Sequence, residues 1–217
     1  MGVGLPLVMS QLAGVFEQLK RDLLAPGGPS ITTMRNYSFA MLVYGPEQEF
    51  EMRRKVRQLS DELRAQSWAV LEISLQRLLL QRLRGLEEGV LESWIETEKR
   101  QSRRNPERAW LRVKEQLANL LEGEEGLAQD VVRLVDDFCR QYPEAARSSL
   151  IWVKRLGALY PFYRCSSLLR HLDGKTGQVP VILLYPGERK DKTALSFMGK
   201  MPADRDYRPR IYSAEMF

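Results

Sequence analysis

The chain has 217 residues, of which 44% are hydrophobic, so it is long enough to bury a substantial core. Its 33 Lys and Arg residues against 28 Asp and Glu residues give a net charge of +5, an excess that does not by itself indicate a nucleic-acid binder. Two cysteines and one histidine argue against a four-ligand zinc site, and the lack of any run of 18 apolar residues argues against a membrane span. We therefore expect a cytoplasmic protein with reduced thiols.

The first part of the chain alternates between helix and strand patterns. Short continuous apolar runs predict the strands, whereas apolar residues recurring every three or four positions predict the helices. Ser74 is a suitable N-cap for the third helix. A strand, helix, strand order is typical of a parallel sheet, because the crossover between parallel strands usually contains a helix. The predicted elements are a helix at 8–24, a strand at 37–44, a helix at 47–64, a strand at 68–73 and a helix at 75–83.

The segment from 85 to 142 carries no strand pattern, and we interpret it as a charged helical insertion. Three helices are predicted in it, at 86–99, 106–121 and 127–142, and Asn105 could cap the second.

Charge is distributed unevenly within this segment. Residues 99–114 contain seven basic and one acidic residue, a net charge of +6, whereas residues 122–137 contain six acidic and one basic residue, a net charge of −5. The basic run could bind the phosphates of a nucleic acid or a partner protein, or it could pair with the acidic segment nearby. The candidate contacts are Arg100, Arg103, Arg104, Arg108 and Arg112.

Strand and helix patterns return in the last third of the chain. Its most apolar run is bounded by Pro186 and Gly187, which should end a buried strand. The whole pattern predicts one α/β domain over residues 1–217, with a mostly parallel central sheet flanked by helices, of a Rossmann-like or degenerate P-loop-like type. The predicted elements are a strand at 150–153, a helix at about 162–172, a strand at 179–185 and returns to the sheet at 195–199 and 207–212.

A charged loop should follow the predicted strand at 179–185. Open α/β sheets carry their binding sites at the carboxyl ends of the strands, which makes this loop a candidate for partner binding, although an ordinary solvated loop is an equal alternative. The candidate residues are Glu188, Arg189, Lys190, Asp191 and Lys192.

The residues that could support catalysis or nucleotide binding do not form a known set. Gly45 lies between a strand and a helix, where a phosphate-binding loop would lie, but proline and three glutamates surround it in place of the glycines, lysine and Ser or Thr that such a loop needs. The single His171 has no Ser or Cys motif beside it. We therefore predict a protein that is not an enzyme and that holds no metal or cofactor.

The C-terminal stretch resembles the terminal signature of the BrxB family, a component of BREX bacteriophage-exclusion systems. The resemblance rests on Val181-Ile-Leu-Leu-Tyr-Pro-Gly187, Leu195-Ser-Phe-Met-Gly199 and Tyr207-Arg-Pro-Arg-Ile-Tyr212, with support from the opening helix, Gly45-Pro46, the strand near Ile73 and Tyr160-Pro161-Phe162. It covers most of the chain and is weakest from 85 to 142. We interpret the signature residues as specifying the fold; they are Tyr185, Pro186, Gly187, Gly199, Tyr207, Arg208 and Tyr212.

The resemblance implies a bacterial protein encoded with a methyltransferase, a large ATPase and a PglZ-type protein with a phosphatase fold. It supplies no catalytic residues. We expect a non-catalytic assembly component whose first partner is the PglZ-type protein. The alternatives are a nucleic-acid-binding subunit that uses the basic run to bind DNA, and a degenerate nucleotide-binding protein. The apolar positions of the insertion could also pack against a second copy of the chain.

Overall fold

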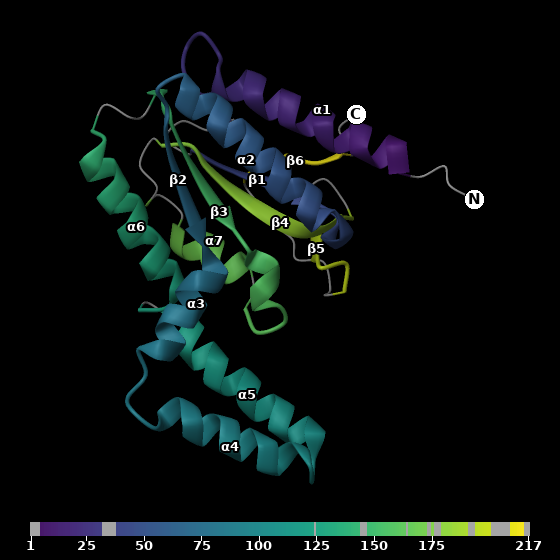
Figure 1. Cartoon of the computed structure of the whole chain (residues 1–217), viewed down its shortest axis with the longest axis vertical. Helices are drawn as coiled ribbons and strands as arrows, with labels where there is room; N and C mark the ends of the chain where they lie inside the picture. Colours follow the sequence, from purple (N-terminus) through teal and green to yellow (C-terminus); the bar gives the residue numbers. More distant parts are fainter. Residues whose placement is uncertain are drawn as a thin grey trace.

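The computed structural model describes residues 5–31, 38–123, 125–143, 147–163, 165–172, 175, 179–190, 194–200 and 209–214, with side chains of the first helix from Leu12 onward. It is an α/β fold built on a six-stranded, mostly parallel sheet, as the sequence predicted (Figure 1).

Five strands of the sheet run parallel. In order across the sheet they are β2 (Ala69–Ser74), β3 (Ser149–Lys154), β4 (Val181–Arg189), β1 (Phe39–Tyr44) and β6 (Arg210–Tyr212). The sixth strand, β5 (Leu195–Phe197), pairs antiparallel with the end of β4. Because parallel strands point the same way, the carboxyl ends of β1, β2 and β3 lie at the same edge of the sheet.

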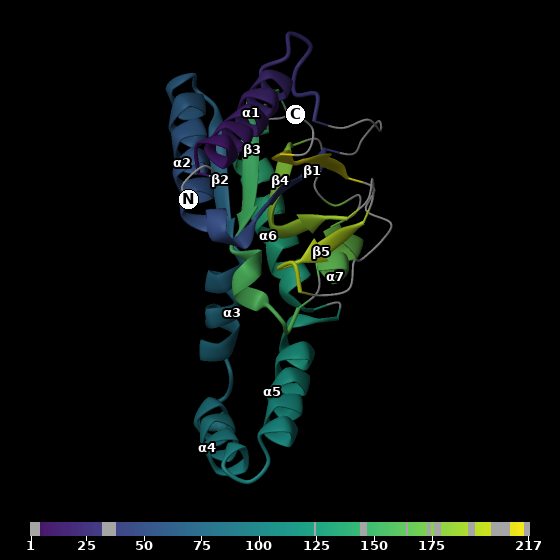
Figure 2. The same ribbon diagram turned by 90° about the vertical axis from the view of Figure 1, so that its right-hand side faces the viewer.

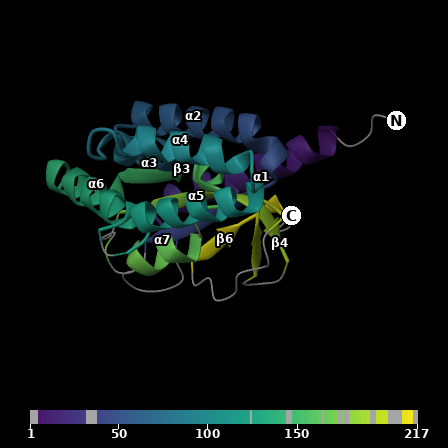
Figure 3. The same ribbon diagram turned by 90° about the horizontal axis from the view of Figure 1, so that it is seen from below.

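Two helical layers cover the sheet because alternate side chains of its central strands point to opposite faces. Ala40 and Leu42 of β1 lie in the core beneath α1 (Leu5–Leu23) and α2 (Glu49–Ala65). Met41 and Val43 lie in the core on the other face, with α6 (Leu127–Gln141) and α7 (Cys165–Leu172). Figure 3 shows α2 on one side of the strands and α7 on the other.

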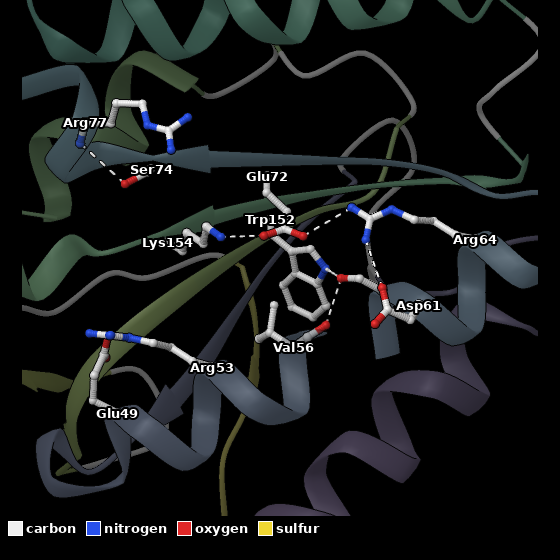
Figure 4. Close-up of polar contacts among 11 residues, drawn as sticks. Glu49, Arg53, Val56, Asp61, Arg64, Glu72, Ser74, Arg77, Trp152 and Lys154 are labelled. Carbon is white, nitrogen blue, oxygen red and sulfur yellow. Dashed lines mark hydrogen bonds and ion pairs between the residues drawn. The ribbon is translucent and has the colours of Figure 1, made fainter. Parts of the chain in front are cut away.

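A buried hydrogen-bond chain attaches α2 to the sheet. The indole Nε1 of Trp152, a fully buried residue of β3, donates to the hydroxyl oxygen of Ser60 at 3.0 Å. The Ser60 hydroxyl in turn donates to the carbonyl oxygen of Val56 at 2.8 Å (Figure 4). Both polar groups are therefore satisfied inside an apolar core, where an unpaired donor would destabilise the fold.

The helices predicted between residues 75 and 142 are present, and two of the proposed caps are confirmed. Ser74 accepts a hydrogen bond from the Arg77 backbone N–H at the start of α3 (Leu75–Arg84). Asn105 does the same for Arg108 at the start of α5 (Pro106–Leu121). Another of these helices, α4 (Val90–Ser102), runs beside α5.

These helices have different surroundings. The apolar face of α6 is buried against the sheet, whereas α4 buries no residue completely. Together α4, α5 and the turn at 103–105 project from the body of the molecule, and we call this pair the arm (Figure 2). A one-domain organisation with an insertion over the whole of 85–142 stays a prediction.

The prediction that the strand beginning near Val179 ends before Pro186 is wrong. Parallel pairing with β1 continues to Tyr44 opposite Pro186, and β4 then runs on to Arg189 as the partner of β5. Proline is tolerated because its position lies at the change of partner, where its carbonyl accepts a hydrogen bond from the Met198 N–H at 2.9 Å. The predicted helix at 162–172 is also shorter, since α7 begins at Cys165.

Gly187 should be essential for the hairpin formed by β4 and β5. A Cβ atom at this position would lie 2.3 Å from the carbonyl oxygen of Ser196, and backbone atoms cannot move away cheaply. We predict that Gly187→Ala lowers the free energy of unfolding by about 1–3 kcal/mol in urea denaturation, the usual effect of overpacking.

Gly27→Ala is the matched control, because a Cβ there would meet no atom within 4 Å and the backbone does not adopt a positive φ. Equal stability changes for the two substitutions would contradict the importance of the close approach at Gly187.

Candidate functional site

A cleft of about 280 Å³ opens at the carboxyl edge of the sheet, on the face covered by α2. It is lined by the ends of β1, β2 and β3, by Leu184 in the middle of β4, and by residues of α2 and α3. Its charged side chains come from three separate segments of the chain: Glu49, Arg53 and Arg57 from α2, Glu72 and Arg77 from β2 and α3, and Lys154 and Arg155 from the end of β3. Five cations and two carboxylates leave a net charge of +3.

Glu72 organises one side of the cleft. Its carboxylate accepts hydrogen bonds from Lys154 and, at 3.2 Å, from Arg64, which also contacts Asp61 (Figure 4). Partial burial opposes ionisation of Glu72, but these two cations outweigh it and hold the pKa of the carboxyl below its ordinary value. Glu72 is therefore an ionised, charge-neutralised anchor that positions Lys154.

Glu49 organises the other side. It accepts hydrogen bonds from the Tyr44 hydroxyl, from Arg53 at 2.8 Å and from Arg155 at 3.3 Å. Burial and the hydrogen bond to Glu49 both raise the pKa of Tyr44, so its hydroxyl stays protonated and donates. Arg155 also donates twice to Gln76, at 2.6 and 3.0 Å, which fixes its guanidinium between α2 and α3.

Two arginines in the cleft differ from the others in having no carboxylate partner among the described residues. Within the described part of the chain, the side chains of Arg57 and Arg77 form no ion pair. Figure 4 shows Arg77 in the first turn of α3, beside the end of β2, where its backbone N–H donates to Ser74. The cleft thus combines a fixed set of paired charges with two exposed guanidinium groups.

A second hollow of about 240 Å³ adjoins the first and shares Glu49, Arg53 and Arg155 with it. Its other walls include Pro186 and Met198. The β4–β5 hairpin therefore reaches the same edge of the sheet as the charged cleft.

The turn after β1 does not have the geometry of a phosphate-binding loop. The backbone N–H of Gly45 donates to the side-chain oxygen of Gln48 at 3.0 Å, and the Glu47 carboxylate occupies the space next to the Gly45 Cα. Both features agree with the interpretation of this turn from its sequence, because a free N–H and a lack of negative charge are what a phosphate requires.

The predicted partner-binding loop is shorter than expected. Glu188 and Arg189 belong to β4, and Lys190 follows them and forms an exposed ion pair with Glu188. Arg189 donates to the Ser213 hydroxyl at 3.5 Å. Asp191 and Lys192 lie outside the described residues. Partner binding by this segment stays a prediction.

The five arginines of the predicted basic patch are all exposed, at the end of α4, in the turn and on the first half of α5. Among the described residues none of them pairs with the acidic segment. That segment pairs elsewhere: Asp130 with Arg82 at 2.5 Å, Glu125 with Arg133 at 2.8 Å, and Asp137 with Arg140. No direct ion pair therefore joins the two segments among the described residues, where no carboxylate pairs with Arg100, Arg103, Arg104, Arg108 or Arg112.

The family is decided by a comparison with protein-family models. The model for the BREX protein BrxB matches residues 71–211, about two thirds of the chain. The chain belongs to the BrxB family. It is therefore a BrxB component of a BREX phage-defence system. Searches among curated proteins and among solved structures found no match. In the described part of this BrxB chain, no helix is long and apolar enough to cross a membrane.

The signature residues of this BrxB chain make internal contacts. Tyr185 is buried and its ring lies 5.5 Å, centroid to centroid, from that of Phe197. Gly199 adopts a positive φ of 64°, which favours glycine. The Tyr212 hydroxyl donates to Asp22 at 2.8 Å and so joins β6 to α1. Such contacts support a fold-specifying role; Tyr207 and Arg208 lie outside the described residues.

Sequence reasoning missed the charged cleft of this BrxB protein, although a signal for it exists. Glu72 interrupts the apolar run of one strand, Lys154 ends another, and Arg155 directly follows it. Once a parallel sheet is predicted, residues that end its strands are expected to meet at one edge.

Glu72 should make stability depend on pH. Because its pKa is depressed in the folded state, its ion pairs stabilise the fold above the ordinary pKa of 4.5, and this stabilisation is lost as pH falls through the lower folded value. We predict that Glu72→Gln lowers the free energy of unfolding by about 1 kcal/mol at neutral pH and that the difference shrinks in acid. Urea denaturation across this range measures it.

The control is Glu92→Gln, since Glu92 is exposed on α4 and forms no ion pair with a described residue. A Glu72→Gln deficit that stayed constant with pH would show that the ion pairs are not its cause.

Proposed function

We propose that this BrxB protein is a non-enzymatic assembly component of its BREX system that binds a partner protein through the arm. The single observation that carries the proposal is the exposed apolar surface of the arm. Ile95 on α4 and Leu111 on α5 are 46% and 55% exposed, and α4 has no fully buried residue. Projecting helices that leave large apolar side chains in water are typical of interaction surfaces.

The charges around these apolar residues define the chemistry of the partner. The five exposed arginines of the basic patch lie on the same arm and pair with no described residue. The arm therefore fits a protein surface with an apolar centre and an acidic rim, because opposite charges at the rim steer association and fix the register.

A PglZ-type protein is the partner that we place first, with the large ATPase and the methyltransferase next. The preference for PglZ comes from the resemblance to the family, which implies that the chain is encoded with such a protein. The non-enzymatic role is supported by the Gly45 turn, where Gln48 and Glu47 occupy the positions that a phosphate-binding loop leaves open.

Leu111→Glu should weaken binding of the partner protein without unfolding BrxB. A glutamate in the apolar centre of the interface would be desolvated without a matching cation, whereas on the free protein Leu111 already faces water. We predict at least a tenfold loss of affinity for the PglZ-type protein of the same system, measured by co-purification and by titration calorimetry.

Phe50→Glu is the matched control, because Phe50 is 80% exposed on α2, outside the arm. Unchanged PglZ binding by Leu111→Glu, or an equal loss in both variants, would contradict docking on the arm. Size-exclusion chromatography of BrxB alone shows whether the arm instead binds a second copy of the chain, because Leu111→Glu would then change the size of the free protein.

A second candidate function is nucleic-acid binding by the basic patch. It is favoured by the observation that the acidic segment leaves these arginines unneutralised. Arg108 and Arg112 are one helical turn apart on α5, so both could contact the phosphates of one DNA strand.

The DNA hypothesis predicts binding that weakens steeply with salt. If both arginines contact phosphates, Arg108→Gln with Arg112→Gln should lower the slope of log affinity against log salt by roughly two, measured by fluorescence anisotropy on a DNA duplex. The control replaces Arg21 and Arg54, which are exposed on α1 and α2. Absence of DNA binding at low salt would exclude this function.

A further inference from the structure

We propose that the cleft at the carboxyl edge of the sheet binds the phosphate group of a small organic phosphate, such as a nucleotide. This site is separate from the arm, and it does not depend on the partner that BrxB binds. The inference rests on three observations: the cleft has a net positive charge, two of its arginines are unengaged, and its position matches the place where open α/β sheets bind ligands.

The charge of the cleft selects an anion. Its two carboxylates are already neutralised, Glu72 by Lys154 and Arg64, and Glu49 by Arg53 and Arg155. A cation would therefore meet no free carboxylate among the residues that line the cleft. An anion would meet guanidinium groups, which bind phosphate oxygens with two parallel hydrogen bonds.

Arg57 and Arg77 are the residues expected to hold the phosphate. Both line the cleft, Arg57 from the middle of α2 and Arg77 from the first turn of α3. Neither forms an ion pair within the described chain, so binding would break no existing contact of these side chains. The N-terminus of α3, capped by Ser74 at the wall of the cleft, adds partial positive charge.

The size of the cleft limits the ligand. A volume of about 280 Å³ lies near the lower end of the range for small-molecule sites, enough for a phosphate with a small organic part. The adjoining hollow of about 240 Å³, which ends at Pro186 and Met198, could receive the rest of a larger ligand. Binding of this kind differs from that of a phosphate-binding loop, because side chains rather than the Gly45 turn hold the anion.

The test is titration calorimetry of the full chain with inorganic phosphate and with pyrophosphate, at an ionic strength held constant with chloride. We expect saturable binding of one anion per chain. The double variant Arg57→Gln with Arg77→Gln should weaken it at least tenfold, since each guanidinium supplies charge-assisted hydrogen bonds. Both residues are exposed, so the variant should fold, which circular dichroism checks.

Two further variants make the result specific. Arg21→Gln with Arg54→Gln removes the same charge from α1 and α2 at positions that do not line the cleft, and should bind phosphate as the wild type does. Arg77→Lys keeps the charge but loses the paired geometry, and should fall between the wild type and Arg77→Gln.

The proposal would be overturned by heats that do not saturate, by equal weakening in the cleft variant and in the Arg21→Gln with Arg54→Gln control, or by full binding in the folded cleft variant. None of these outcomes bears on the PglZ interaction, which is measured separately with Leu111→Glu.

Discussion

The structure depends on the burial of β1 and β4 on both faces. Every residue of β1 is buried, and so are the first seven of β4, so apolar side chains must be covered above and below the sheet. The two helical layers meet this requirement, with α1 and α2 on one face and α6 and α7 on the other. The hydrogen bond from Trp152 to Ser60 adds a directional contact to one layer and sets the position of α2 over β3. The arm contributes little to either core and projects from a body that is already complete.

This arrangement determines where charge can gather. With the faces of the sheet covered, polar residues that end the parallel strands remain at the carboxyl edge, and α2 and α3 bring further charges to the same place. Glu49 and Glu72 each hold two cations there, which fixes the walls of the cleft. The basic patch arises differently: its arginines lie on the projecting arm, and the acidic segment pairs instead through Asp130 with Arg82, Glu125 with Arg133, and Asp137 with Arg140. BrxB thus carries two basic surfaces with separate structural origins.

Much of the fold follows from local sequence patterns, and the remainder depends on contacts between distant residues. The apolar runs at 39–44 and 181–185 predict buried strands, and Ser74 and Asn105 cap helices as expected, because these features act over a few residues. The continuation of β4 beyond Pro186 could not be predicted from the neighbouring residues alone. It depends on the pairing of Gly187 to Arg189 with β5, which comes later in the chain. The cleft was missed for the same reason. The proximity of Glu49, Glu72 and Arg155 can be predicted only once the order of the strands in the sheet is known. The BrxB signature identified the family, and the burial of its Tyr185 and Tyr212 agrees with a role in specifying the fold.

The doubly covered sheet is the stable body of BrxB, and the arm depends on it. Amide hydrogen exchange, measured residue by residue, distinguishes the two, because amides in the most stable unit exchange only through global unfolding. We expect the amides of Met41 and Leu183 to exchange slowest and those of α4 to exchange faster, through local opening of the arm. Exchange in the middle of β4 as fast as in α4 would contradict it.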